Sequence, residues 1–330
     1  MDCVYIQHCN ENPCEIHRLG EFGGSSFWPG MCNSRAHRGI ADATLPERRG
    51  LPTISPRLPA ARYRMLEKRA VTWSAQQYVQ FEDERTRPAR DLLAALPAID
   101  ARTAIDIGCG PGNSTGLLAA RFSAGAVSGL DSSADMIAAA RKRLPGLRFD
   151  IADIGGWVYE NDTAFDVILA NAVLHWLPDH AKLFPALVAK LAPGGALAVQ
   201  MPDNLDEPTH RLMREIAAEG PWAAKLAAAA AAAARPPMPT ANRYYEILSG
   251  AGCRADIWRT TYYHALSGGA GAVVEWFKGS GLRPFIAPLN DGEREDFLAR
   301  YRSAVARAYP AQTDGCVLLP LPRLFIVAVH

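Results

Sequence analysis

The sequence lacks a charge excess of either sign. Its 330 residues carry 35 Lys and Arg against 34 Asp and Glu, a formal net charge of +1. A chain so balanced has no global field to attract nucleic acid or an anionic membrane, so we expect neither as a partner. It also lacks an apolar run of about 18 residues, and residues 1–24 lack a signal peptide's apolar stretch. We therefore expect a soluble, cytoplasmic protein.

No CxxC pair occurs, although the chain has seven cysteines. Four of them stand near the start: Cys3, Cys9, Cys14 and Cys32. A small zinc module that also uses His8 and His17 is one interpretation. The spacing argues against it, because structural zinc sites normally show closely spaced ligand pairs. We expect no metal.

Residues 1–64 lack periodic apolar positions and are rich in Pro and Arg. Such a segment cannot bury enough apolar surface to offset its ordering entropy, which favours a disordered extension. An alternative is that the start is set too early and that Met65 is the true start. We expect one domain over residues 65–330. Its core spans about 99–205, and a substrate cap with the last two strands spans about 206–330.

Strand and helix patterns alternate through the middle of the chain. Strands are predicted at 103–107, 126–130, 147–151, 165–170 and 196–201, with helices at 113–122, 134–144 and 179–191. This alternation predicts an α/β fold, a doubly wound parallel sheet with helices on both faces. Before it, residues 73–96 are predicted to be helical, with Pro88 opening a second helix. After it we predict helices at 208–218, 242–248, 270–279 and 293–308 and strands at 256–265 and 324–329. The alanine run 227–234 fits either a helix or a surface loop.

Three glycines, Gly108, Gly110 and Gly112, follow the first predicted strand and open a helix. Open α/β sheets bind ligands at this position, where glycine lets the backbone turn sharply and approach a ligand closely. Asn113 stands where a dinucleotide fold has its third glycine, so an oxidoreductase is disfavoured. The chain also has no G-x-x-x-x-G-K-[ST] motif for a nucleoside triphosphate.

Polar residues end the next strands as well. Asp131 follows the second strand, Asp153 the third and Asn171 the fourth. The carboxyl ends of parallel strands share one edge of the sheet, so we expect these side chains to face one crevice. For each Asp, the alternative is a structural role as the N-cap of the next helix.

The segment Asp106-Ile-Gly108-Cys-Gly110-Pro-Gly112 resembles the first motif, D-x-G-x-G-x-G, of the class I S-adenosylmethionine-dependent methyltransferases. By this resemblance the glycine loop would cradle the methionine part of S-adenosyl-L-methionine. Asp131 would hold the ribose, Asp153 with Ile154 the adenine, and Asn171 would line the methyl-transfer cleft. The full expected cofactor set is Asp106, Gly108, Gly110, Gly112, Asn113, Asp131, Ser132, Met136, Asp153, Ile154 and Asn171. The cofactor has a sulfonium charge and no phosphate, which agrees with the lack of Lys near this loop.

Other stretches resemble the trans-aconitate 2-methyltransferases. They include 73–78, 171–179, 199–204, 256–264, 281–284 and 322–327. The chain departs from that family in the alanine-rich segment 223–239 and in residues 1–64, which have no counterpart there. The resemblance implies a small tricarboxylate acceptor that is converted to its monomethyl ester.

A tricarboxylate is fully ionised near neutral pH, so its reacting oxygen needs no general base. Its spectator carboxylates need cationic forks, a task that suits arginine. The expected acceptor residues are Arg259, Arg283, Arg87, Tyr263, His175 and Trp176. With 29 Arg against six Lys, any single Arg is more often a surface charge than a ligand. Tyr262 and Tyr263 point to opposite faces of a strand, so only one faces the cleft.

Two alternatives stay open within this fold. One is a class I methyltransferase that acts on another small-molecule acceptor, and the other is a catalytically silent nucleotide-binding relative. We expect the protein to be a monomer.

Overall fold

The computed structural model describes residues 82–123, 126–160, 163–233 and 237–330. The predicted extension 1–64, the proposed start at Met65 and the predicted helix from Trp73 to Phe81 lie outside the described residues. So do the cysteines and histidines of the zinc alternative. Within the described residues, no group of three or more His, Cys, Asp or Glu could hold a metal ion, and no helix is long and apolar enough to cross a membrane.

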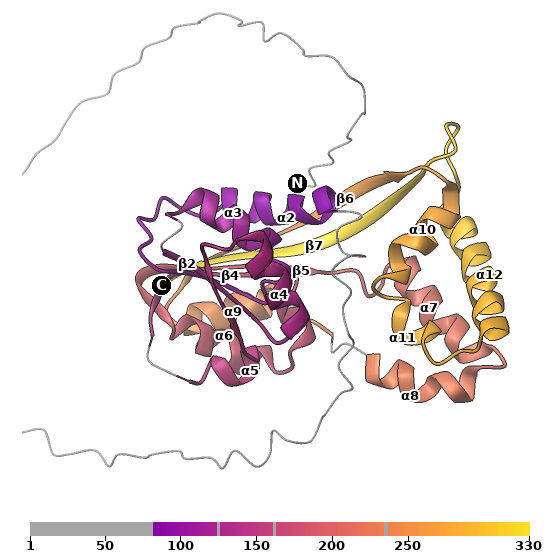
Figure 1. Ribbon diagram of the computed structural model, residues 1–330, viewed down its shortest axis with the longest axis horizontal. Coiled ribbons are helices and arrows are strands. Elements are labelled where there is room, and N and C mark those ends of the chain that lie inside the picture. Colours follow the sequence, from indigo (N-terminus) through magenta and orange to yellow (C-terminus); the bar gives the residue numbers. More distant parts are fainter. Residues whose placement is uncertain (1–81, 124–125, 161–162, 234–236) are drawn as a thin grey trace, which may run out of the picture. The chain divides into compact units, whose positions relative to one another are not determined.

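Seven strands form one sheet in the order β3-β2-β1-β4-β5-β7-β6 (Figure 1). Their bounds are β1 Ala104–Ile107, β2 Val127–Asp131, β3 Arg148–Ile151, β4 Phe165–Asn171, β5 Leu191–Pro202, β6 Arg254–Leu266 and β7 Val317–Val329. Strands β1 to β5 are parallel, whereas β7 is antiparallel to β5 and to β6. The predicted α/β fold is confirmed, but its sheet is mixed rather than wholly parallel.

The helices follow the predicted order with three short additions. They are α2 Glu82–Ala94, α3 Asn113–Arg121, α4 Ala134–Arg143, α5 Ile154–Trp157, η3 Leu174–Trp176, α6 His180–Val188, α7 Pro208–Glu219, α8 Ala223–Ala233, α9 Ala241–Gly250, α10 Gly269–Lys278, α11 Arg283–Ile286 and α12 Asp291–Ala308. The short elements α5, η3 and α11 were not predicted. The alanine run lies within α8, which decides for the helical alternative.

The prediction that Pro88 opens a helix is wrong, because α2 runs through it from Glu82 to Ala94. A proline inside a helix removes one hydrogen bond and crowds the preceding turn. The following residues Ala89, Leu92 and Leu93 are buried, and the two leucines belong to the core of the sheet. Their burial offsets the cost of the interior proline.

Alternate residues of β6 and β7 face two different cores. On one face, Tyr262 and Phe325 pack with Leu92 of α2 and Leu118 of α3. On the other, Ile257 and Leu324 pack with residues of α6 and α9. We call these the α2 face and the α9 face.

Helices α7, α8, α10, α11 and α12 share a separate apolar core with the distal ends of β6 and β7. Figure 1 shows these helices gathered around that end of the two long strands. Trp222 and Phe297 meet edge to face in this core at 5.3 Å between ring centroids. The two antiparallel strands thus contribute residues to all three cores.

Candidate active site

The glycine loop between β1 and α3 is held in a left-handed conformation at all three glycines. The φ angles are +71° at Gly108, +54° at Gly110 and +88° at Gly112. The backbone N–H groups of Gly108 and Cys109 both donate to the carbonyl of Leu130, at 2.8 and 2.9 Å. These two hydrogen bonds fix the loop to the end of β2.

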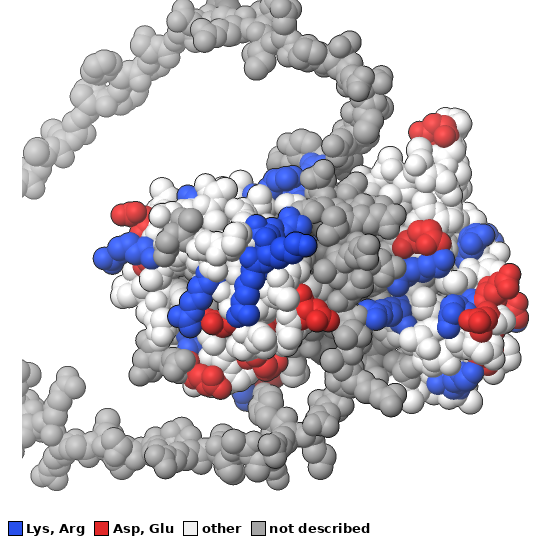
Figure 2. Space-filling view, viewed as in Figure 1, with Lys and Arg blue, Asp and Glu red and all other residues white. Residues whose placement is uncertain are grey.

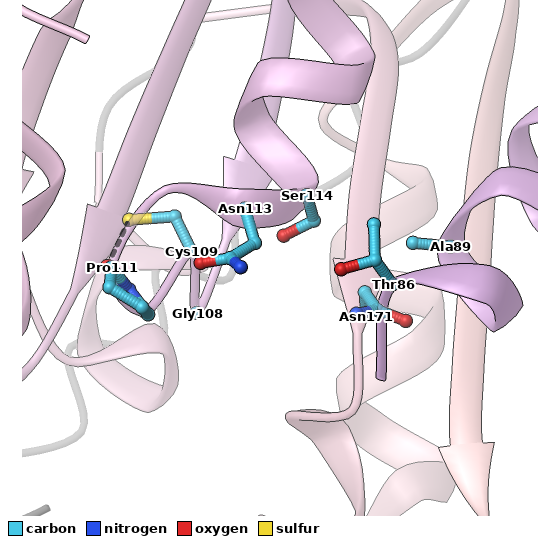
Figure 3. Close-up of a pocket in the computed structure, with 9 residues that line it drawn as sticks. Thr86, Ala89, Gly108, Cys109, Pro111, Asn113, Ser114 and Asn171 are labelled. Atoms are coloured by element: carbon cyan, nitrogen blue, oxygen red, sulfur yellow. Dashed lines mark hydrogen bonds between the residues drawn. The ribbon is translucent and has the colours of Figure 1, made fainter. Parts of the chain in front are cut away.

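A pocket opens beside this loop (Figure 3). Its lining residues are Thr86, Ala89, Gly108, Cys109, Gly110, Pro111, Asn113, Ser114 and Asn171. Figure 3 shows Thr86 and Asn171 side by side across the pocket from Asn113. Among the described residues, the buried Oδ1 atoms of Asn113 and Asn171 have no hydrogen-bond partner. None of the described lining residues is Lys or Arg, so the pocket suits a ligand without phosphate.

Asp106 lies fully buried under the loop. Its Oδ2 accepts hydrogen bonds from the hydroxyls of Ser114 and Thr115, each at 2.7 Å, and its Oδ1 has no partner among the described residues. Burial raises the pKa of Asp106 to about 7, against the opposing effect of the two hydroxyl donors. A cationic group bound beside it would stabilise the ionised form.

The raised pKa of Asp106 predicts a pH dependence of folding. The folded protein binds the carboxyl proton of Asp106 more tightly than the unfolded chain does. The contribution of Asp106 to the free energy of unfolding is therefore highest at low pH. It falls between about pH 4 and about pH 7, in total by on the order of 2–4 kcal/mol. Asp106→Asn keeps the size of the side chain and cannot titrate. We expect urea unfolding to show a gain of Asp106→Asn over the wild type at pH 8 that shrinks at pH 5.

Comparing the wild type with Asp106→Asn separates the effect of Asp106 on stability from that of the histidines. Burial lowers the pKa of His180 and, aided by Arg323 and Arg87, lowers that of His264 to about 4. Lowered histidine pKa values make stability rise with pH, which is the opposite slope, and they act equally in both proteins. A difference between the two proteins that does not change with pH would contradict the prediction.

Asp131 joins the end of β2 to the glycine loop. Its carboxylate accepts from the backbone N–H of Gly110 at 3.0 Å and from that of Ser133 at 2.8 Å. Ser133 in turn caps α4 by accepting from the N–H of Met136. Met136 is buried and Ser132 is exposed. The carboxylate therefore stands beside the loop as expected, while its role toward a ribose stays a prediction.

Asp153 is the N-cap of α5, where its Oδ1 accepts from the N–H of Gly156 at 3.1 Å. The structural alternative considered for this residue is thus realised. Ile154 follows it and is buried. The backbone N–H of Ala152 donates to the carbonyl of Asp131, which keeps the ends of β2 and β3 together. Contact of Asp153 and Ile154 with an adenine stays a prediction.

His175 and Trp176 are the last two residues of η3, which begins two residues after the positive-φ residue Ala172. His175 is buried, and its ring lies 4.8 Å from that of Trp176 between centroids. Trp176 is 50% exposed, although large aromatic side chains are usually buried. The structure places both residues at the carboxyl end of β4, next to the pocket-lining Asn171.

The predicted acceptor arginines lie in different surroundings. Arg259 pairs with Asp203 at 2.8 Å, with 63% of its side chain exposed. It also interacts with Glu207, whose pKa is raised by burial. Tyr263 is half-buried on the same face of β6, and Arg283 begins α11 among the C-terminal helices.

Arg87 lies on the opposite face of the sheet from Arg259. Its guanidinium carbon is 5.3 Å from the centroid of the Tyr262 ring, and it is 4.0 Å from Asp91. The hydroxyl of Tyr262 donates to Asp91 at 2.6 Å. The predicted residues are therefore not all brought together.

Two polar residues on the same face of the sheet as Asn171 were not singled out in the sequence. Arg323 on β7 stands opposite Thr260, and Gln200 on β5 stands between Asn171 and Phe325. The signal for Arg323 was its position in the stretch 322–327. The signal for Gln200 was that it is a single polar residue in an otherwise apolar strand pattern.

Comparison with known proteins connects this site to a family. The family model described as "Methyltransferase domain" matches residues 104–195. The trans-aconitate 2-methyltransferase of Methylobacterium nodulans is 57% identical over 256 residues, which cover 78% of this chain and 97% of the relative. The chain belongs to the trans-aconitate 2-methyltransferase family. Relatives with the same name are 54% identical in Rhodopseudomonas palustris (78% and 98% covered) and 52% identical in Rhizobium meliloti (79% and 99% covered).

Membership of this family confirms the predicted enzyme class, a methyltransferase, and its cofactor, S-adenosyl-L-methionine. The matched domain, residues 104–195, contains the glycine loop, both strand-end aspartates, Asn171 and η3. Arg259, Arg283 and Arg323 lie beyond it.

Proposed function

We propose that this protein transfers the methyl group of S-adenosyl-L-methionine to a carboxylate oxygen of trans-aconitate and forms the monomethyl ester. The observation that carries the proposal is an identity of more than 50% along nearly the whole length of relatives with that activity in their names. The glycine-loop pocket supports it as well, because its lining includes the amide oxygens of Asn113 and Asn171, which have no hydrogen-bond partner among the described residues.

The residues of the pocket fit the cofactor. The loop of Gly108, Gly110 and Gly112 would cradle its methionine part, above the buried Asp106. Asn113 and Asn171 each bring a buried Oδ1 that has no partner within the described part of the chain and can accept a hydrogen bond from it. Asp131, with Ser132 and Met136 on the following turn, would face the ribose, and Asp153 with Ile154 the adenine. When bound, the cofactor supplies an electrophilic methyl group.

The acceptor oxygen is already ionised at neutral pH, so the protein needs no general base. Its task is alignment, which can supply roughly 7–11 kcal/mol toward a displacement of this kind. His175 and Trp176 are proposed to bound the acceptor next to Asn171. The sequence predicts Arg87, Arg259, Arg283 and Tyr263 as candidate partners of its remaining carboxylates, and the structure separates Arg87 from Arg259 on opposite faces of the sheet.

The proposed acceptor is a small dissolved anion, which requires neither a membrane nor a nucleic-acid surface. The face displayed in Figure 2 carries both basic and acidic side chains. We accordingly propose a cytoplasmic enzyme that acts as a monomer.

The decisive experiment is product analysis. Protein, S-adenosyl-L-methionine and trans-aconitate should give a compound of the mass of the monomethyl ester, and S-adenosylhomocysteine should appear in equal amount. Reactions without protein, and with citrate in place of trans-aconitate, are the controls. Turnover with a different small acid would favour the alternative of another acceptor. Stabilisation by S-adenosylhomocysteine without any turnover would favour the silent relative, and stabilisation by NADH instead would overturn the proposal.

A further inference from the structure

The α2 face carries a continuous row of residues from the cofactor pocket to the last strands. Asn171 pairs in register with Gln200, and Gln200 pairs with Phe325. Arg323 lies two residues before Phe325 on β7, so its side chain is on the same face. Arg323 thus lies on the same face of the sheet as Asn171, Gln200 and Phe325, and it extends the row that begins at the pocket.

The spacing of this row suits a small acid. Asn171 and Arg323 are two strands and two residues apart, which places their Cα atoms about 12 Å from each other. A six-carbon acid is long enough to place one carboxylate near the pocket at Asn171 and others near the flexible guanidinium of Arg323.

Arg323 shares its surroundings with a second guanidinium. Both Arg323 and Arg87 act on the half-buried His264 and on the buried Tyr262, and together they help to keep His264 neutral. Tyr262 is fixed by its hydrogen bond to Asp91, and the ring of Trp258 stacks on Phe325 at 5.0 Å beneath the row. Arg323 is held on the strand β7 and Arg87 on the helix α2, and two guanidinium groups placed in this way are suited to binding carboxylates.

Gln200 adds a hydrogen-bond donor between these two arginines and the pocket. Its side chain is 1% exposed, and its Nε2 has no hydrogen-bond partner among the described residues. A buried donor without a partner costs stability, and a ligand that brings an acceptor oxygen would satisfy it. A carboxylate lying along the row would bring such an oxygen.

Arg259 offers a poorer site for an anion. It lies on the α9 face, where it forms an ion pair with Asp203 and interacts electrostatically with Glu207. A trianion bound there would have to displace one carboxylate and lie close to another. The two faces of β6 therefore differ in what they can bind.

We propose that Arg323 and Arg87 bind the spectator carboxylates of the acceptor and that Gln200 donates a hydrogen bond to it. This inference rests on the proposed function and specifies which face of the sheet holds the acceptor. The specificity for a polycarboxylate then comes from the last strand and from α2, and the Arg259 side of β6 does not provide it.

Steady-state kinetics of Arg323→Gln and Arg87→Gln test this assignment. Loss of one charge-assisted pair should raise the KM for trans-aconitate about 10- to 100-fold and leave the KM for S-adenosyl-L-methionine within about 3-fold. Arg323→Lys keeps the charge without the fork and should recover part of the loss. Arg254→Gln, an exposed position at the start of β6, is the matched control and should behave as the wild type.

Each variant's melting temperature and affinity for S-adenosylhomocysteine show whether it is folded. A folded Arg323→Gln with an unchanged KM for trans-aconitate would overturn the assignment. So would Arg259→Gln raising that KM while Arg323→Gln and Arg87→Gln do not. A wild-type protein that makes no ester is a different outcome, since it removes the proposed function itself. If Arg323→Gln does not fold, Arg323→Lys and Arg87→Gln still decide.

Discussion

Replacing Gly108 by alanine should destabilise the fold by about 2–5 kcal/mol, which combines left-handed backbone strain with overpacking. The φ angle of this residue is +71°, a region that side chains with Cβ rarely adopt. The added Cβ would also lie 2.3 Å from Cγ2 and 2.6 Å from Cβ of Val173. Neither atom is the far end of a flexible chain, so the backbone must move. Urea unfolding of the purified variant measures the loss.

The clash should also reach the acceptor side of the site. Val173 precedes η3 and follows Ala172, which itself has a φ of +54°. A displaced Val173 would shift His175 and Trp176 together with the turn. The double variant Gly108→Ala with Val173→Ala is the control, because it relieves the overlap and leaves the backbone strain. If the double variant loses as much stability as the two single changes added together, the contact with Val173 is not the cause.

The glycine loop and the strand ends could be predicted because their signals are local. A strand, three glycines and a helix follow one another within residues 104–121, and the parallel order of β1 to β4 brings Asp131 and Asn171 to one edge. The same local signal could not separate two roles for Asp153, because a helix N-cap and a ligand contact use the same carboxylate. Only the hydrogen bond to Gly156 identifies the cap.

The acceptor side depends on contacts that are distant in the sequence. Arg259 stood out in an aromatic strand, but its partner Asp203 follows the end of another strand, β5. Strand alternation showed that Tyr262 and Tyr263 point apart. Which of them shares a face with the pocket depends on the register of β6 with β7, and on α2, which lies more than 160 residues earlier. Arg323 could be singled out only once that register was known.

Pro88 shows a third limit. Its local preference for the start of a helix is real, yet α2 continues through it. The apolar contacts that decide this outcome come from the sheet, whose strands begin after α2 in the chain. A short window around the proline does not contain them.

Gly110→Ala should lower the affinity for S-adenosylhomocysteine about 100-fold or more at little cost in stability. No atom of the described residues lies within 4 Å of a Cβ added at Gly110, so the folded protein loses only about 1–2 kcal/mol through the φ of +54°. The open space beside this residue belongs to the pocket that we propose for the cofactor. A methyl group there would occupy the position of the ligand's close approach to the backbone.

Gly194→Ala is the matched control for this experiment. Gly194 has a φ of +78°, an added Cβ there also meets nothing within 4 Å, and it lies in β5, outside the pocket lining. Titration calorimetry with S-adenosylhomocysteine should therefore show wild-type affinity for Gly194→Ala and a large loss for Gly110→Ala, at similar free energies of unfolding. Equal affinities in the two variants would mean that the ligand does not approach the backbone at Gly110. The proposed cradle would then have to be abandoned, because the other two glycines are crowded by Val173 or by α4 and leave no such space.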